Sequence, residues 1–159
     1  MEQNFYQTLL TRASVITGTE ENILANLANV SALLGQHLPR INWAGFYLMD
    51  AGTLVLGPFW GKPACLRIKP GSGVCGTAVA TDSVQRIADV HQFPGHIACD
   101  AASASEIVVP IHQNGKVVAV LDIDSPFPER FTEEDEAGLC ALAAMLEQRS
   151  WAKCGYDLN

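Results

Sequence analysis

The feature that most restricts the fold is an Asn-Gly pair, Asn114-Gly115, between two apolar runs. The runs are residues 107–112 (IVVPIH) and 117–123 (VVAVLDI). Asn and Gly readily adopt the left-handed backbone of a tight hairpin turn, so the two runs predict a pair of antiparallel strands. Because proline has no N–H to donate to a neighbouring strand, Pro110 predicts that the first strand is an edge strand or contains a bulge.

The rest of the chain predicts helices at the two ends and strands between them. Apolar residues recur at helical spacing over residues 20–38, and a shorter helix precedes this one around Phe5–Val15. A variant capping box at residues 132–135 starts a C-terminal helix. Between the helices we expect a hairpin from residues 41–50 and 53–60, a short strand at 65–68, and a glycine-rich turn entering a short helix at 71–82. This order predicts an α+β domain, with a central antiparallel sheet and the terminal helices packed on one of its faces.

Length and composition exclude several classes of protein. The 159 residues predict a single domain, residues 1–159, and 48% of them are hydrophobic, as expected of a globular chain. The net charge of -7 and the absence of any Lys or Arg run argue against a nucleic-acid partner. The chain has neither a secretory signal pattern nor an apolar stretch long enough to span a membrane, so we expect a cytoplasmic protein.

Five cysteines in a reducing compartment argue against a static disulfide framework. Cys140 lies in a helical stripe of Leu and Ala, which predicts a buried, inert thiol, and Cys154 lies in a polar tail. Cys65, Cys75 and Cys99 lie instead in or beside the long segment 61–104, in turn-like surroundings. Residue type alone leaves three roles open for them: a redox or nucleophilic role, a structural buried thiol, or metal binding. Their wide spacing, with no CxxC or HxxxH pair, disfavours a zinc site even though His91 and His96 are near.

Three acidic residues flank the predicted hairpin. Asp122 and Asp124 are two residues apart on one strand, so both face the same side of the sheet. They form either a solvated strand end, a site for a cation, or a pair that shares a proton. If the register set by the two-residue turn continues along the strands, Glu106 lies opposite Ile123, near both aspartates.

Two aromatic residues are predicted to share a face of the first hairpin. Trp43 and Tyr47 are four residues apart on one strand, so both point to the same side. They either pack in the core or form an aromatic wall against a methyl group or sulfur of a ligand.

Several of these motifs, in this order, resemble those of the free methionine-(R)-sulfoxide reductases, a family built on the GAF fold. The resemblance covers nearly the whole chain and is most specific in NWAGFY, PAC followed by GVCG, DVHQFPGHIACDAASASEIVVP, and LDIDSP. It implies a GAF-like domain that has a loop-covered ligand pocket on the sheet face opposite the helices. It also implies reduction of free methionine (R)-sulfoxide by thiol chemistry. A non-catalytic GAF sensor of a small molecule is the alternative, and a structural zinc protein is disfavoured by the cysteine spacing.

The resemblance also implies roles for individual residues. Cys99 resembles the catalytic nucleophile, Cys65 the main resolving cysteine and Cys75 an auxiliary one. The family's substrate-binding and acid residues correspond to Glu106, Asp122 and Asp124, and its pocket aromatics correspond to Trp43 and Tyr47. Crowded carboxyl groups raise one another's pKa, so one of them can stay protonated and donate a proton to the departing oxygen.

The implied chemistry needs no bound cofactor and no metal. A disulfide formed in turnover would be reduced by thioredoxin, which draws its electrons indirectly from NADPH. The expected partners are thus free methionine-(R)-sulfoxide and thioredoxin. A homodimer is compatible with the sequence, which does not fix the oligomeric state.

Overall fold

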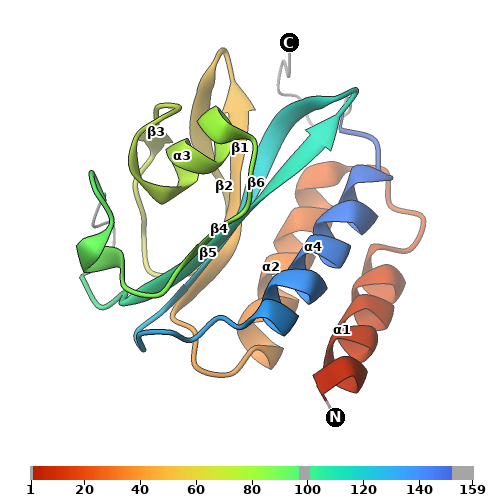
Figure 1. Ribbon diagram of the computed structural model, residues 1–159. Coiled ribbons are helices and arrows are strands. Elements are labelled where there is room, and N and C mark those ends of the chain that lie inside the picture. The colour runs from red at the N-terminus through yellow and green to blue at the C-terminus, as the bar shows by residue number, and fades with distance from the viewer. Residues whose placement is uncertain (1, 97–100, 152–159) are drawn as a thin grey trace.

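The computed structural model describes residues 2–96 and 101–151, which form helices around one antiparallel sheet (Figure 1). The elements are, in chain order, α1 (Glu2–Thr17), α2 (Ile23–His37), β1 (Trp43–Asp50), β2 (Thr53–Gly61), β3 (Arg67–Ile68), α3 (Gly73–Thr81), β4 (Gln85–Ile87), a 3₁₀ turn (Val90–Gln92), β5 (Ser105–Gln113), β6 (Lys116–Ser125) and α4 (Glu133–Glu147). The strand order across the sheet is β3-β2-β1-β6-β5-β4, and every neighbouring pair is antiparallel. The predicted α+β class is confirmed.

The sheet separates two apolar clusters. On one face, α2 and α4 pack against the strands and α1 packs on these two helices. Together they form the larger cluster, which includes Leu27, Leu34, Phe46, Leu121 and Leu142 (Figure 1). On the other face, α3 and β3 cover a smaller cluster, to which Trp43, Tyr47, Val74, Cys75 and Val120 belong. The expected placement of the terminal helices on one face is therefore confirmed. No helix in the described ranges has the length and apolar character needed to cross a membrane.

The helix ends follow local capping rules. Asn22 caps α2 by accepting a hydrogen bond from the N–H of Ala25 (3.2 Å), and Thr132 and Asp135 form the predicted capping box of α4. The expectation that the first helix is the shorter one is wrong, because α1 has 16 residues and α2 has 15. The apolar pattern ends near Val15, but α1 continues until Gly18, whose positive φ of 45° ends the helix.

Hairpin β5–β6 has the predicted Asn114-Gly115 turn, in which Gln113 pairs with Lys116. The register shifts by one residue between Ile111 and His112, where β6 contains one residue more than β5. Beyond this bulge Glu106 pairs with Asp124, so the predicted pairing of Glu106 with Ile123 is wrong by one position.

Pro110 does not mark an edge strand, because β5 lies between β6 and β4. Strand β4 is only three residues long and pairs with residues 106–108 of β5. Pro110 lies beyond the end of β4, at a position where its missing N–H costs no bond to that strand. The hairpin does contain a bulge, but its extra residue lies in β6, opposite the step from Ile111 to His112, so the predicted bulge in the strand of Pro110 itself is wrong.

Candidate active site

A cavity of about 40 Å³ lies on the sheet face opposite the three long helices. Its lining comes from β1, β3, β5, β6, the start of α3 and the segments that join them: Trp43, Tyr47, Pro63, Ala64, Ile68, Ser72, Gly73, Val74, Cys75, His96, Ser103, Glu106, Asp122 and Asp124. Six of the eight residues that the sequence singled out are in this lining. Cys65 lies beside it, next to Ala64, and Cys99 falls outside the described residues.

The three acids meet in this cavity because of the bulge in the β5–β6 hairpin. Directly paired residues of antiparallel strands point to the same face, so the pairing of Glu106 with Asp124 puts both beside Asp122. In the uninterrupted register Glu106 would share a face with Ile123, which belongs to the cluster under the helices. The shift of one residue therefore moves Glu106 from the helix face to the cavity face.

Two of the three acids are buried, and Asp124 beside them is half-buried. Glu106 and Asp122 are 6% and 5% exposed, and the described residues put no Lys or Arg in the lining. Burial, reinforced by the charges of Asp122 and Asp124, raises the pKa of Glu106 well above its usual range, and burial also raises the pKa of Asp122. The Oδ1 atom of Asp122 is buried and has no hydrogen-bond partner. A solvated strand end is therefore the wrong interpretation for Asp122.

Cys75 lies in the first turn of α3 and points at the acids. Its Sγ is 3.9 Å from Oε1 of Glu106, and the residue is 4% exposed and a free thiol. Burial, followed by the charges of Asp122 and Glu106, raises the pKa of this thiol well above its ordinary value. Cys75 is therefore a protonated, shielded thiol at rest.

The two aromatic side chains form one wall of the cavity and also hold the segment that carries Cys65. Trp43 stacks against Tyr47 and Phe59, with ring centroids 5.9 and 5.2 Å apart. Trp43 Nε1 donates a hydrogen bond to the carbonyl of Lys62 (3.1 Å), and the Tyr47 hydroxyl donates to the carbonyl of Cys65 (2.9 Å). Burial, together with nearby acids, raises the pKa of Tyr47, which keeps its hydroxyl protonated and able to donate.

The remaining cysteines differ in state. Cys65 is half-buried and disulfide-bonded, whereas Cys75 and Cys140 are free. Cys140 is only partly buried against the core under the helices, so the prediction that it is a buried residue holds in part. Cys99 and Cys154 lie outside the described residues.

The sequence interpretation gave His96 no place among the site residues. Its Nε2 is 4.0 Å from Oε2 of Glu106, and burial, with a smaller contribution from His91, lowers its pKa below the usual histidine value. The sequence does show a histidine three positions before Cys99. Its closeness to Glu106 could not be predicted, because it depends on the path of the irregular segment 93–96.

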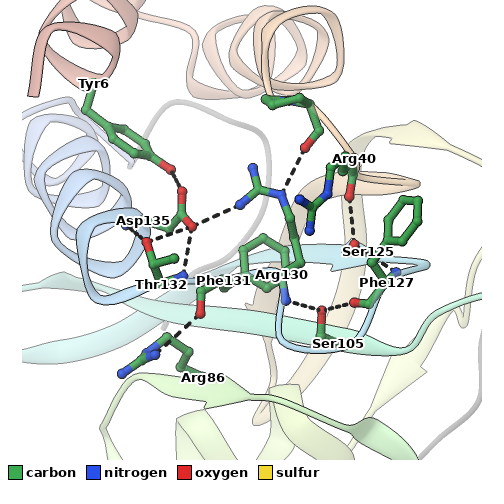
Figure 2. Close-up of polar contacts among 11 residues, drawn as sticks. Tyr6, Arg40, Arg86, Ser105, Ser125, Phe127, Arg130, Phe131, Thr132 and Asp135 are labelled. Atoms are coloured by element: carbon green, nitrogen blue, oxygen red, sulfur yellow. Dashed lines mark hydrogen bonds and ion pairs between the residues drawn. The ribbon is translucent and has the colours of Figure 1, made fainter. Parts of the chain in front are cut away.

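Two serines fix the strand ends that carry Glu106 and Asp124. Ser105 and Ser125 are cross-strand partners and both are fully buried. Ser105 Oγ donates to the carbonyl of Phe127 (2.6 Å), while Ser125 Oγ donates to the carbonyl of Arg40 (2.7 Å) and accepts from the N–H of Phe127 (3.1 Å) (Figure 2). The chain leaving β6 is thereby tied to both strands one residue away from the acids.

This anchor continues into the helix layer. The N–H of Arg130 donates to Ser105 Oγ (3.3 Å), and its guanidinium pairs with Asp135 at the start of α4 (2.9 Å) (Figure 2). Asp135 also accepts a hydrogen bond from the Tyr6 hydroxyl of α1 (2.5 Å). Burial would raise the pKa of Asp135, but the bonds from Tyr6 and Thr132 and the charge of Arg130 lower it below the usual value. A chain of polar contacts thus joins the helices to the end of the sheet that holds the acids.

Comparison with known proteins places the chain in a family. The GAF domain family matches residues 3–149. The chain is 58% identical over 144 residues to the free methionine-R-sulfoxide reductase of Escherichia coli (strain K12), covering 91% of this chain and 87% of the relative. Its structure resembles that of the Staphylococcus aureus enzyme fRMsr in complex with substrate, with a TM-score of 0.86, 50% identity, and coverage of 89% of this chain and 93% of that one.

A second substrate complex, of the free methionine-R-sulfoxide reductase from Neisseria meningitidis, has a TM-score of 0.88 and 42% identity, covering 91% of this chain and 87% of that one. Both the fold and the sequence thus match enzymes of one kind over most of their length. The chain belongs to the free methionine-R-sulfoxide reductase family, whose members have the GAF fold.

Proposed function

We propose that this protein, acting as one catalytic domain over residues 1–159, reduces free L-methionine (R)-S-oxide to methionine. The observation that carries the proposal is a cluster of carboxyl groups beside a thiol and an aromatic wall, in which Glu106 and Asp122 are buried and Asp124 is half-buried. A sulfoxide reductase needs a proton donor, a cation site for the substrate ammonium, and apolar surface for the methyl group. The relatives named as reductases over most of this chain add support.

Cys99 is the nucleophile in this proposal. Its thiolate attacks the sulfoxide sulfur, and a protonated carboxyl group transfers a proton to the oxygen as the S–O bond breaks. The oxygen passes to the Cys99 sulfur as the bond between the two sulfur atoms breaks, so the products are methionine and a sulfenic acid on Cys99. Glu106 fits the role of proton donor because burial and its acidic neighbours raise its pKa, so it keeps its proton at a pH where an ordinary carboxyl group has lost it.

Cys65 resolves the sulfenic acid. Its thiol attacks the Cys99 sulfur, water leaves, and a disulfide forms. The disulfide-bonded state of Cys65 and the free state of Cys75 support this order of use. Cys75 serves as the auxiliary thiol, since burial beside three acids keeps it protonated and unreactive. If the bridge instead joins Cys75 to Cys99 alone, these roles are reversed.

The substrate is the free amino acid rather than a residue within a protein. Asp122 and Asp124 line the cavity and can pair with the ammonium group, which a peptide-bound residue lacks. A peptide would leave the buried carboxylate of Asp122 without this partner, which disfavours it by a factor on the order of 10⁴ or more. Trp43 and Tyr47 supply the apolar wall for the side chain. The preference for the R epimer follows from the family alone.

Substrate entry requires segment 61–70 to move. The cavity of about 40 Å³ is far smaller than the roughly 300 Å³ or more of typical ligand sites. Gly61 and Gly71 flank the segment with φ angles of 134° and 86°, which only glycine adopts easily. Two hydrogen bonds, from Trp43 and Tyr47, hold the segment in place.

The reductant in this proposal is thioredoxin, with NADPH as the ultimate donor, and the protein works in the cytoplasm, where thiols stay reduced. No prosthetic group takes part. A homodimer is compatible with the mechanism but is not needed for it, since all the residues proposed to act come from one chain.

A coupled assay tests the proposal. Purified protein is mixed with methionine sulfoxide, thioredoxin, thioredoxin reductase and NADPH, and NADPH oxidation is followed. We expect turnover by the wild type, none by Cys99→Ser, and a Cys65–Cys99 disulfide in peptide maps after one oxidising turnover. If the protein binds methionine sulfoxide without oxidising NADPH, the alternative, a GAF sensor, is supported. If Cys99→Ser still reduces methionine sulfoxide, Cys99 is not the nucleophile.

A further inference from the structure

The cavity gathers a set of metal-ligating atoms that the proposed reaction does not require as a set. The Sγ atom of Cys75 and one carboxylate oxygen each from Glu106 and Asp122 all lie within 4.8 Å of one another. The three residues come from α3, β5 and β6, and all are buried. Nε2 of His96 lies outside this set of three atoms but is 4.0 Å from Oε2 of Glu106, which makes it a candidate for a fourth ligand. The spacing of cysteines and histidines along the sequence could not reveal this set, because two of its members are acids on paired strands.

These donors are close to the geometry that zinc needs. Zinc is bound tetrahedrally, with Zn–S near about 2.3 Å and Zn–O near about 2.0 Å, so sulfur and oxygen ligands of one ion lie about 3.5 Å apart. Sγ of Cys75 is 3.9 Å from Oε1 of Glu106. Small side-chain rotations, with no change in the strands or in α3, would bring these atoms onto one ion.

A second observation points to a missing cation. Oδ1 of Asp122 is buried, faces a cavity with no Lys or Arg in its described lining, and has no hydrogen-bond partner. Such an atom in a native structure calls for a ligand. The substrate ammonium can meet this need during turnover, but an ammonium ion gains nothing from the thiol. A thiophilic divalent ion gains from both the thiolate and the carboxylates.

We propose that the reduced protein binds one Zn²⁺ through Cys75, Glu106 and Asp122, with His96 as the fourth ligand. Binding releases the thiol proton of Cys75 and the proton that the proposed function places on Glu106, and the ion neutralises the charges that this leaves close together. The cavity of about 40 Å³ has room for an ion, and the ion would occupy Asp122, which the substrate ammonium also needs. Zinc and substrate therefore exclude each other, and the reductase is competitively inhibited. The inhibition depends on the proposed function, but the binding does not.

Cobalt provides a direct test, because Co²⁺ occupies zinc sites and its bond to a thiolate gives a near-ultraviolet charge-transfer band. The host is the double variant Cys65→Ser/Cys99→Ser, which removes the two thiols proposed for catalysis and keeps Cys75. Titration of the reduced protein with CoCl₂ is expected to give the thiolate band and tetrahedral visible bands at one ion per chain. Zn²⁺ should displace the cobalt.

Variants of the ligands locate the site. Glu106→Gln or Asp122→Asn in the same host should weaken cobalt binding at least tenfold, and Cys75→Ser should abolish the charge-transfer band. Cys140→Ser is the matched control and should leave the band unchanged. Thermal unfolding verifies that each variant is folded. Absence of the band, or a band that survives Cys75→Ser in a folded protein, overturns the proposal.

Because this readout is optical and the host lacks the catalytic thiols, it is independent of turnover. A wild-type protein that binds cobalt but does not reduce methionine sulfoxide would contradict the proposed function and leave the zinc site standing. An active wild type in which Zn²⁺ leaves the apparent KM for methionine sulfoxide unchanged would contradict the competitive inhibition.

Discussion

Replacing Asp122 with Asn tests whether the cavity recognises the substrate ammonium by charge. Asn keeps the shape of the side chain and removes its charge. Asp122 is 5% exposed and its Oδ1 has no other partner, so its bond to an ammonium would be charge-assisted and shielded from water. Such a bond contributes about 1.5–3 kcal/mol. Since about 1.4 kcal/mol corresponds to a factor of ten, kcat/KM for free methionine sulfoxide should fall about 10- to 150-fold in Asp122→Asn.

The variant should not lose activity through unfolding. Burial raises the pKa of Asp122 above its ordinary value of 3.8, which means that the folded state holds the proton more tightly than the unfolded state does. The wild type therefore loses stability from this group as the pH rises above about 4. Asn does not titrate, so Asp122→Asn should become more stable relative to the wild type over that range.

The assay compares two substrates and two variants. Steady-state kinetics are measured with free and with N-acetylated methionine sulfoxide, because acetylation removes the ammonium charge. We expect Asp122→Asn to lower kcat/KM for the free substrate and to leave the already low value for the acetylated one nearly unchanged. Asp50→Asn, at the far end of β1, is the matched control and should alter neither value. An equal loss for both substrates, or a loss below about threefold for the free one, would refute the assignment of Asp122 to the ammonium.

Three further changes test other parts of the structure. Glu106→Gln should lower kcat/KM by about 10²–10⁴-fold. Because burial raises the pKa of Glu106, wild-type activity should fall as the pH rises through that pKa. If the variant shows the same fall of activity at alkaline pH, Glu106 is not the acid. Ser125→Ala removes buried hydrogen bonds and should lower the free energy of unfolding, measured in urea, by about 1–3 kcal/mol. Ser14 is exposed, so Ser14→Ala is the control and should not lower it. Equal effects of the two substitutions would contradict the anchoring role of Ser125. The hydrogen bond to Asp82 raises the pKa of His112, so its contribution to stability is present below the ordinary value of 6.5 and is lost as the pH rises through the raised pKa. His112→Gln should therefore flatten the dependence of thermal stability on pH in that window, and parallel curves for the two proteins would exclude the effect.

The secondary structure could be predicted well where a local rule decides it. Asn114-Gly115 predicted the turn of the β5–β6 hairpin, and Thr132 with Asp135 predicted the start of α4. Alternation along one strand placed Trp43 and Tyr47 on a common face. Each of these predictions depends on residues a few positions apart.

The arrangement of the acids could be predicted only in part. The sequence placed Asp122 and Asp124 on one face, but the register of β5 depends on an extra residue in β6, opposite the step from Ile111 to His112, and the sequence did not predict this residue. The twist and packing of the whole sheet decide where a bulge forms. The register predicted without the bulge pairs Glu106 with Ile123, whose side chain lies on the helix face of the sheet.

Contacts between distant segments could not be predicted from the sequence. Tyr47 was expected to line a pocket, and it also binds the carbonyl of Cys65, which is 18 positions away. His96 approaches Glu106 for a similar reason, through the path of an irregular segment. Side chains in such segments have no periodicity from which their direction can be derived.

The division of the interior by the sheet has a consequence for hydrogen exchange. The helix face is held by a large cluster with three helices and by the anchor that runs from Tyr6 to Ser105. Among the described residues, the cavity face is covered by α3, β3 and short connections around a small cluster. Amides of β3 and α3 should therefore exchange through local openings of low free energy, while those of β1, β5 and β6 exchange only on global unfolding. A protein built in this way can open its cavity repeatedly during turnover without exposing the part of the interior that keeps it folded.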